Sequence, residues 1–91
     1  MSERTARVAS SVGLHARPAS MLAAEATQVR TLVMVRKPGG IPVDTRSVLS
    51  LLSLDARCGD ELIFSAEGDD SDQALDVLVK VLETDYDQAE S

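Results

Sequence analysis

The chain has 91 residues, a formal net charge of -6 and a single cysteine. This length allows one compact domain, and a composition of 44% hydrophobic and 26% charged residues is that of a folded globule rather than a disordered chain. One cysteine excludes a disulfide framework and a thiolate metal cluster, and the apolar runs are too short for a membrane span or a signal peptide. We expect one cytoplasmic domain over residues 1–91, with a frayed acidic end at 85–91 and with Cys58 buried as a small apolar residue.

The charge is unevenly distributed along the chain. Positions 1–57 hold eight basic and four acidic residues, whereas positions 58–91 hold one basic residue, Lys80, and eleven acidic ones. Such a split can steer an anionic ligand or an acidic protein toward the less acidic portion. Nucleic acid is a poor candidate, because Phe64 and Tyr86 cannot form a stacking platform and the basic residues are not clustered.

The hydrophobic pattern predicts seven elements in the order β-α-β-β-α-β-α. Alternating character predicts a first strand over 4–9, in which Ala6 and Val8 face the core. An alanine-rich stretch predicts a helix over 16–29. The single apolar stripe of this helix consists of Ala19, Leu22, Ala23, Ala26 and Val29.

The middle of the chain predicts a hairpin and a short helix. A β-branched strand over 31–36 is followed by Lys-Pro-Gly-Gly, a turn sequence that should fold a strand over 41–43 back against it. The short helix is expected over 47–54, with the Ser47 side chain accepting from its first amides. A helix of this length cannot bury all its apolar residues, so some of Val48, Leu49 and Leu52 should be exposed. We interpret Met21 and Met34 as core residues.

The last third of the chain predicts a strand over 61–66, which buries Leu62 and Phe64, and a final helix. Asp70 or Ser71 should cap this helix, and Gln73 stands where a capping box requires it. Its apolar face is expected to hold Ala74, Val77, Leu78, Val81 and Leu82. Since each helix has one apolar stripe, three helices should cover one face of a four-stranded, mostly antiparallel sheet, a two-layer α+β fold.

A candidate site lies where the first predicted helix begins, in the stretch Gly13-Leu14-His15-Ala16-Arg17-Pro18. The amides of Ala16 and Arg17 have no carbonyl partners within the helix. Pro18 suits this first turn, because an amide there would have no helical partner to lose. The first-turn amides, the positive end of the helix dipole and the Arg17 guanidinium together form an anion site.

His15 supplies a nucleophile beside this anion site. The field that attracts an anion disfavours a positive charge on the imidazole, which leaves a ring nitrogen able to attack phosphorus. Gly13 permits the sharp turn that exposes the ring. A lone histidine is more often a packing residue, but this position favours acceptance of a phosphoryl group by His15, with Arg17 stabilising the product.

The stretch from Gly13 to Ala19, followed at the right interval by Arg46, Ser47 and a short apolar helix, resembles the HPr family. These are the histidine-containing phosphocarriers of the bacterial phosphoenolpyruvate:sugar phosphotransferase system. The resemblance covers nearly the whole chain, including Gly59 and positions 65–68. It implies an open-faced β-sandwich with sheet order 1-4-2-3. It also implies a carrier rather than an enzyme: phospho-enzyme I phosphorylates His15 on Nδ1, and the group passes to sugar-specific enzyme IIA domains.

The resemblance assigns roles to further residues. Ala16 and Arg17 would hold the phosphate, and Ser47 matches the serine that a dedicated kinase phosphorylates in many Gram-positive members. A helix cap explains Ser47 equally well. The implied partners are enzyme I, enzyme IIA domains and, in some members, that kinase and transcriptional regulators. No cofactor, metal, nucleic acid or membrane insertion is implied, and a monomer is expected. The partner-facing residues would be Ser20, Val48, Leu49 and Leu52.

The chain also departs from the family pattern. Val12 stands where many members carry a small polar residue, and Ser50 replaces a glycine common in Gram-positive members. Leu49 and Leu52 stand where methionine or phenylalanine is usual, so the partner-facing surface differs in detail. Two alternatives stay open: a regulatory interaction module of the same fold, and a carrier in a nitrogen-linked phosphorelay. Retention of His15 with Arg17 favours a carrier.

Overall fold

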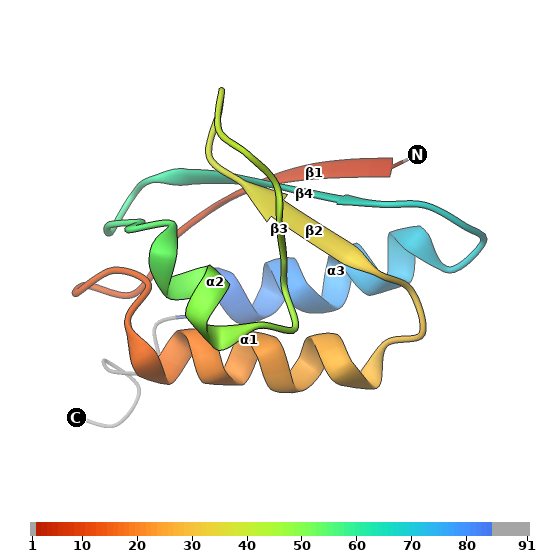
Figure 1. Ribbon diagram of the computed structural model, residues 1–91, viewed down its shortest axis with the longest axis horizontal. Coiled ribbons are helices and arrows are strands. Elements are labelled where there is room, and N and C mark those ends of the chain that lie inside the picture. Colours follow the sequence, from red (N-terminus) through yellow and green to blue (C-terminus); the bar gives the residue numbers. More distant parts are fainter. Residues whose placement is uncertain (1, 85–91) are drawn as a thin grey trace.

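The computed structural model describes residues 2–84, in which four strands and three helices follow in the predicted order. The strands form one antiparallel sheet in the order β1-β4-β2-β3, and the three helices lie on one face of it (Figure 1). The predicted α+β two-layer fold and its strand order are therefore confirmed. The predicted fraying at 85–91 lies outside the described residues. The elements are β1 (Ser2–Arg7), α1 (Ala16–Gln28), β2 (Val33–Arg36), β3 (Val43–Asp44), α2 (Val48–Ser53), β4 (Glu61–Ala66) and α3 (Ser71–Leu82).

The core lies between the sheet and the helices, as the alternating strand pattern requires. Phe64 and Leu62 on β4 are fully buried and face the helices, and Val35 pairs with Phe64 across the β2–β4 ladder. Leu22 on α1 and Leu75 on α3 are also fully buried. β4 occupies the predicted range 61–66, and the predicted α1 stripe is buried except for Val29, the half-buried C-cap.

The remaining strands are displaced or shorter than predicted. β1 begins two residues earlier and ends before Val8, yet Val8 stays buried because it exchanges backbone hydrogen bonds with the turn before β4. The Lys37–Gly40 turn forms, with the Gly40 amide 2.8 Å from the Lys37 carbonyl oxygen. The strand expected over 41–43 is wrong in its bounds, because the chain pairs only at β3. Ile41 is 84% exposed beyond the ladder.

Two core predictions, Met34 and Val77, are wrong. Met34 alternates with the buried Val33 and Val35, so it is half-buried on the face of the sheet that the helices leave open. Val77 is 38% exposed, and Leu75 takes the buried position. α3 packs against α1 as well as against β1 and β4, which turns its buried face toward both layers.

The capping box at the start of α3 is also absent. Asp70 is the N-cap, but its side chain makes no capping hydrogen bond. Its backbone has φ -96° and ψ 14° rather than the extended conformation that directs an N-cap side chain toward the first amides. The predicted helix start is therefore right in position and wrong in its capping contacts.

Two side-chain links tie β1 to α3. Ser2 Oγ and Ser71 Oγ lie 3.1 Å apart, and the Arg4 guanidinium forms ion pairs with Asp76 and, at 3.9 Å, with Asp72. The start of the chain is thus held against its last described helix.

Candidate functional site

His15 is the N-cap of α1, as the sequence predicts. Its backbone is extended, with φ -97° and ψ -169°, and its carbonyl oxygen accepts the first helical hydrogen bond from the Ala19 amide at 3.0 Å. The His15 amide donates to the Gly13 carbonyl oxygen at 3.0 Å, which fixes the turn into the helix. Pro18 is buried beneath the first turn, whereas Ala16 and Arg17 are exposed. The structure therefore places His15, Arg17 and the first-turn amides at the same end of α1, its start.

Gly13 is required at this turn for two independent reasons. Its φ is +87°, a left-handed conformation that side chains rarely adopt. A Cβ added there would lie 2.7 Å from the Ala56 carbonyl oxygen. The next amide, that of Leu14, donates to this same oxygen at 2.9 Å. The His15 loop is thus seated directly on the backbone of the segment that follows α2.

An open hollow of about 520 Å³ lies beside His15, between its loop and the segment after α2. Cys58 is exposed and lines this hollow, so its predicted burial is wrong. The reason is a tight surface turn. The Arg57 amide donates a hydrogen bond to the Asp60 carboxylate, and the Asp60 amide donates one to the Arg57 carbonyl oxygen, each at 2.9 Å. Such a turn leaves Cys58 at its tip.

Some apolar residues of α2 are buried and others are exposed, as the short length of this helix predicts. Leu51 is fully buried and Val48 packs against the core, whereas Leu49 is 80% and Leu52 36% exposed. Val48 therefore contributes to the core. Leu49 and Leu52 are exposed, as is Ser20 on α1, the helix against which α2 packs.

Ser47 caps α2 as predicted. Its Oγ accepts a hydrogen bond from the Ser50 amide at 3.2 Å, and the Leu51 amide donates to its carbonyl oxygen at 3.0 Å. Ser47 is half-buried. The hydroxyl oxygen thus satisfies one of the first-turn amides of α2.

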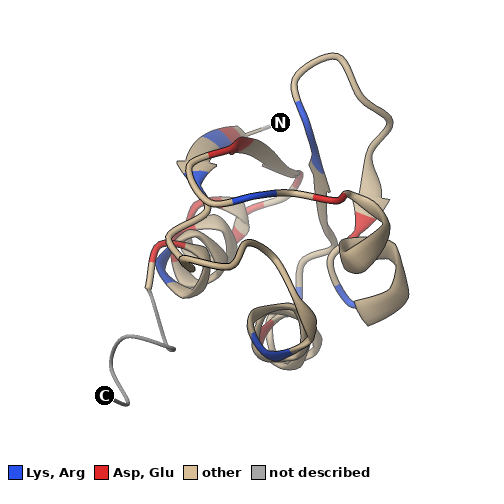
Figure 2. Ribbon diagram, turned by 90° about the vertical axis from the view of Figure 1, so that its left-hand side faces the viewer, with Lys and Arg blue, Asp and Glu red and all other residues tan. Residues whose placement is uncertain are grey.

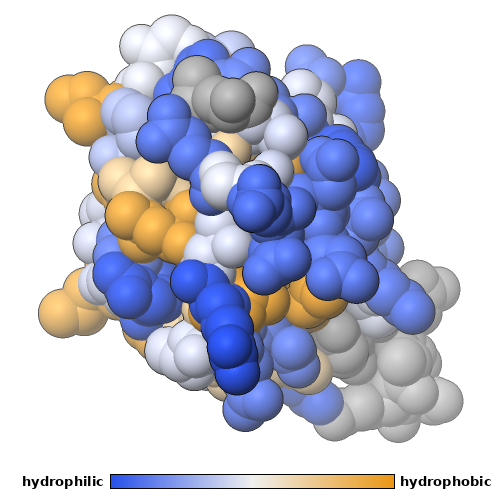
Figure 3. Space-filling model, turned by 90° about the vertical axis from the view of Figure 1, so that its right-hand side faces the viewer, coloured by the Kyte–Doolittle hydropathy of each residue, from blue (hydrophilic) through white to orange (hydrophobic). Residues whose placement is uncertain are grey.

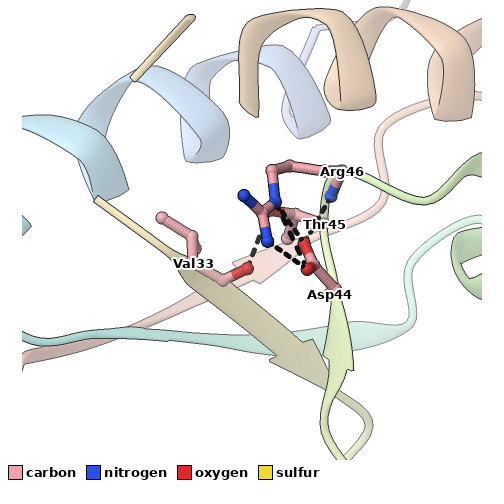
Figure 4. Close-up of polar contacts among 4 residues, drawn as sticks. All are labelled: Val33, Asp44, Thr45 and Arg46. Carbon is pink, nitrogen blue, oxygen red and sulfur yellow. Dashed lines mark hydrogen bonds and ion pairs between the residues drawn. The ribbon is translucent and has the colours of Figure 1, made fainter. Parts of the chain in front are cut away.

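Sequence reasoning missed the partner of Arg46. The Arg46 Nη2 lies 2.7 Å from Asp44 Oδ2, and its Nε donates to Oδ1 at 3.1 Å (Figure 4). The buried Thr45 between them turns the other way and donates to the Val33 carbonyl oxygen at 2.8 Å. The hydrogen bond from Arg46 lowers the pKa of Asp44 despite partial burial, and the same bond raises the pKa of Arg46. Asp-x-Arg in an extended segment was the available signal, because residues two apart share a face.

Basic and acidic positions mix at the end of the molecule where α1 begins. Figure 2 shows this end, with basic positions at the start of α1, beside α2 and on the segment that crosses between α2 and β4. Arg17, Arg46 and Arg57 are all exposed. Asp55 lies on the same segment between α2 and β4 as Arg57, and the Asp44 carboxylate pairs with Arg46, so two of these three basic side chains have an acidic residue close by in sequence.

A family profile described as "PTS HPr component phosphorylation site" matches residues 2–84. The chain belongs to the HPr family. It is 38% identical over 72 residues to the phosphocarrier protein HPr of Mycoplasma pneumoniae, covering 79% of this chain and 82% of the relative. It is 37% identical over 82 residues to the HPr of Streptomyces coelicolor, covering 90% and 88%. The crystal structure of an HPr from Thermoanaerobacter tengcongensis superposes with a TM-score of 0.82 at 34% identity, covering 91% and 92% of the two chains.

Members of the HPr family are phosphocarriers of the phosphotransferase system rather than enzymes, and this chain has that role. Two other relatives carry different names. One is the phosphocarrier protein NPr of Proteus mirabilis, 28% identical over 85 residues that cover 93% of this chain and 94% of the relative. The other is the catabolite repression protein Crh of Bacillus subtilis, whose structure superposes with a TM-score of 0.70 at 31% identity, covering 93% and 97%. Among the described helices, none is long and apolar enough to cross a membrane.

Proposed function

We propose that His15 accepts a phosphoryl group from phospho-enzyme I and passes it to sugar-specific enzyme IIA domains. The observation that carries this proposal is the position of His15 as the N-cap of α1, beside the first-turn amides and Arg17. In the first step a ring nitrogen attacks phosphorus, a P–N bond forms, and the bond from phosphorus to enzyme I breaks. The family resemblance makes this nitrogen Nδ1. In the second step a nucleophilic side chain of enzyme IIA attacks the phosphorus, a new bond to enzyme IIA forms, and the P–N bond to His15 breaks. His15 is then free to accept the next phosphoryl group.

The start of α1 stabilises the phosphorylated form. A phosphoryl group on His15 carries negative charge at the positive end of the helix dipole, near the amides of Ala16 and Arg17. The exposed Arg17 side chain adds a guanidinium suited to phosphate oxygens. Such stabilisation must stay moderate, because the group has to leave again for enzyme IIA.

The docking surface for both partners combines α1 and α2. Ser20, Leu49 and Leu52 are exposed and present small and apolar contacts, with Val48 supporting α2 from below. Ser47, at the start of the same helix, is the candidate for regulatory phosphorylation by a dedicated kinase. A phosphate there would place negative charge next to this apolar surface and weaken docking to acidic partners. Both partners act on the cytoplasmic side, which would place the chain there.

The experiment is phosphorylation of the full chain with phosphoenolpyruvate and enzyme I. The wild type should yield an acid-labile, alkali-stable phosphoprotein, and the His15→Ala variant should not be labelled. Equal labelling of this variant would remove His15 from the function. Arg17→Ala should still be labelled but transfer more slowly to enzyme IIA. Arg30→Ala is the matched control, because Arg30 is exposed just past the opposite end of α1.

A nitrogen-linked phosphorelay is the second candidate, and the similarity to NPr supports it. The similarity to Crh supports a regulatory interaction module in the same way. Parallel transfer assays with a sugar-branch and a nitrogen-branch acceptor domain distinguish the two carrier roles. A chain that is not labelled by any enzyme I would favour the regulatory module.

A further inference from the structure

A second hollow lies at the opposite end of α1 from His15, between the end of α1 and the start of α3. Its volume is about 340 Å³, which is within the range of pockets that bind small molecules. Figure 3 shows this end of the molecule, where apolar side chains in orange lie among hydrophilic ones in blue. The residues that line the hollow are Val29, Arg30, Thr31, Asp70, Gln73, Ala74 and Val77.

The hollow exposes apolar residues that the sequence pattern assigns to the core. Val29 and Val77 belong to the apolar stripes predicted for the first and last helices, yet Val29 is half-buried and Val77 is 38% exposed. Together with Ala74, which is 3% exposed, they form the apolar floor of the hollow. Both departures from the predicted stripes therefore fall at one place. Because removal of apolar surface from water is favourable, this floor suits an apolar group.

One charge of each sign stands on the rim of the hollow. Arg30 and Asp70 are both exposed, and within residues 2–84 the side chain of neither forms an ion pair or a hydrogen bond. The helix dipoles add to this arrangement, because the carbonyl end of α1 attracts an ammonium and the amide end of α3 attracts a carboxylate. A ligand that carries both groups therefore finds an opposite charge for each of them.

We propose that this hollow binds a free α-amino acid with an aliphatic side chain, such as leucine. The Arg30 guanidinium holds the carboxylate of the ligand, the Asp70 carboxylate holds its ammonium, and its side chain covers the apolar floor. A ligand with a single charge would leave one rim charge without a partner, and a ligand without an apolar part would leave the floor in water. The inference does not rest on the phosphocarrier role, because His15 lies at the other end of α1.

The test is a titration of the isotope-labelled full chain with L-leucine, followed through the amide shifts in NMR spectra. The amides of residues 29–31 and 70–77 should shift and saturate with a Kd of about 1 mM, a value that suits a ligand this small. Three probes each lack one feature of leucine: glycine lacks the side chain, isocaproate the ammonium and isoamylamine the carboxylate. Each probe should bind about fivefold more weakly than leucine, or weaker still.

Two variants assign the charges of the ligand to the two rim residues. Arg30→Gln should weaken the binding of leucine about fivefold or more, but not that of isoamylamine, which has no carboxylate. Asp70→Asn should weaken the binding of leucine in the same way, but not that of isocaproate, which has no ammonium. Arg7→Gln and Asp72→Asn are the matched controls, since both residues are exposed and neither lines the hollow. The spectrum of each variant also reports whether the chain is folded.

Several results would overturn the proposal. One is a set of shifts that does not saturate or that lies elsewhere in the chain, and another is a probe that binds as tightly as leucine. Equal weakening by the control variants would show a general effect of charge rather than contacts in the hollow. Shifts of the same amides that depend on protein concentration without any ligand would assign the hollow to a second copy of the chain. Since His15 labelling is read in a separate assay, the failure of one proposal leaves the other intact.

Discussion

The amide of Leu14 donates a 2.9 Å hydrogen bond to the carbonyl oxygen of Ala56. Two backbone segments that lie about forty positions apart in sequence are joined at this point, one leading into α1 and the other leaving α2. Their approach admits no side chain at Gly13, whose backbone contacts Ala56. The geometry of the His15 loop therefore depends on the segment after α2.

The Gly13→Ala variant tests how closely the two backbone segments approach each other. The Gly39→Ala variant separates the cost of backbone strain from the cost of the steric clash. Both glycines have a positive φ, +87° and +77°, but a Cβ at Gly39 meets nothing within 4 Å. We expect Gly39→Ala to lower the free energy of unfolding by about 1 kcal/mol through backbone strain alone. Gly13→Ala should cost about 3 kcal/mol, because the clash adds to the strain. Urea denaturation followed by circular dichroism measures both, and equal losses would contradict the close approach.

The Asp44–Arg46 pair predicts a specific dependence of stability on pH. The hydrogen bond from Arg46 lowers the pKa of Asp44 in the folded state. Its contribution to stability is therefore complete above the unfolded pKa of about 3.9 and is lost as the pH falls through the lower folded value. The contribution is small, because water screens two side chains that are 35% and 53% exposed.

The measurement is a comparison of Asp44→Asn with the wild type across pH. Thermal unfolding should show the variant as less stable at neutral pH, and the two proteins should converge as the pH falls through the lowered pKa of Asp44 in the folded state, where the carboxylate becomes protonated. Arg46→Gln and the double variant complete a thermodynamic cycle that isolates the pair. A difference that persists unchanged at low pH would mean that another contact of Asp44 is responsible.

Ser47→Ala should lower the free energy of unfolding by about 1 kcal/mol, because the first-turn amides of α2 lose the Ser47 hydroxyl as acceptor. Ser47→Asp should keep most of this stability, since a carboxylate also caps a helix. Ser53→Ala, at the exposed end of α2, is the control. If Ser47→Ala proves as stable as the wild type, the hydroxyl has no capping value and the case for a regulatory role becomes stronger.

Docking that uses the exposed Arg17, Arg46 and Arg57 should weaken with salt. Screening lengths fall from about 10 Å at 0.1 M to about 3 Å at 1 M, so the attraction between exposed charges on the two partners declines. Calorimetric titration with enzyme I at two ionic strengths checks this expectation. Because Asp44 already holds Arg46, Asp44→Asn should bind more tightly at low salt and show the steeper salt dependence. A Kd that does not change with salt would mean that the uneven charge distribution serves solubility and not docking.

Local patterns predicted the elements well, and the failures arise where tertiary context decides. The alternation of Leu62 and Phe64 and the helix start at His15 depend on neighbours in sequence, and both are confirmed. Leu75 replaced Val77 on the buried face because α3 packs against two layers at once, a relationship that its own periodicity does not contain. Cys58 is the exception, because the turn that exposes it is local: the Arg57 amide donates to the Asp60 carboxylate only three residues away.

The site residues also divide into those that local sequence predicts and those that depend on distant segments. The positions of His15 and Arg17 at a helix start were predicted, whereas the length of α2 predicted only that some of Val48, Leu49 and Leu52 would be exposed, without saying which. The contact of Gly13 with Ala56 joins distant segments, and nothing near Gly13 in sequence encodes it. The pairing of Arg46 with Asp44 was within reach, because its partners lie two residues apart in an extended segment.

The pairing of β1 with β4 constrains the order in which the chain acquires its structure. Among the strands that the structure describes, β1 is at the edge of the sheet and pairs only with β4, so its residues have no strand to join until positions 61–66 exist. The links from Ser2 and Arg4 to α3 come later still. Such non-local pairing makes folding slower than that of a helical bundle. A ribosome-bound or truncated chain that ends before β4 contains His15 and the α1 sequence but lacks the backbone on which the His15 loop rests.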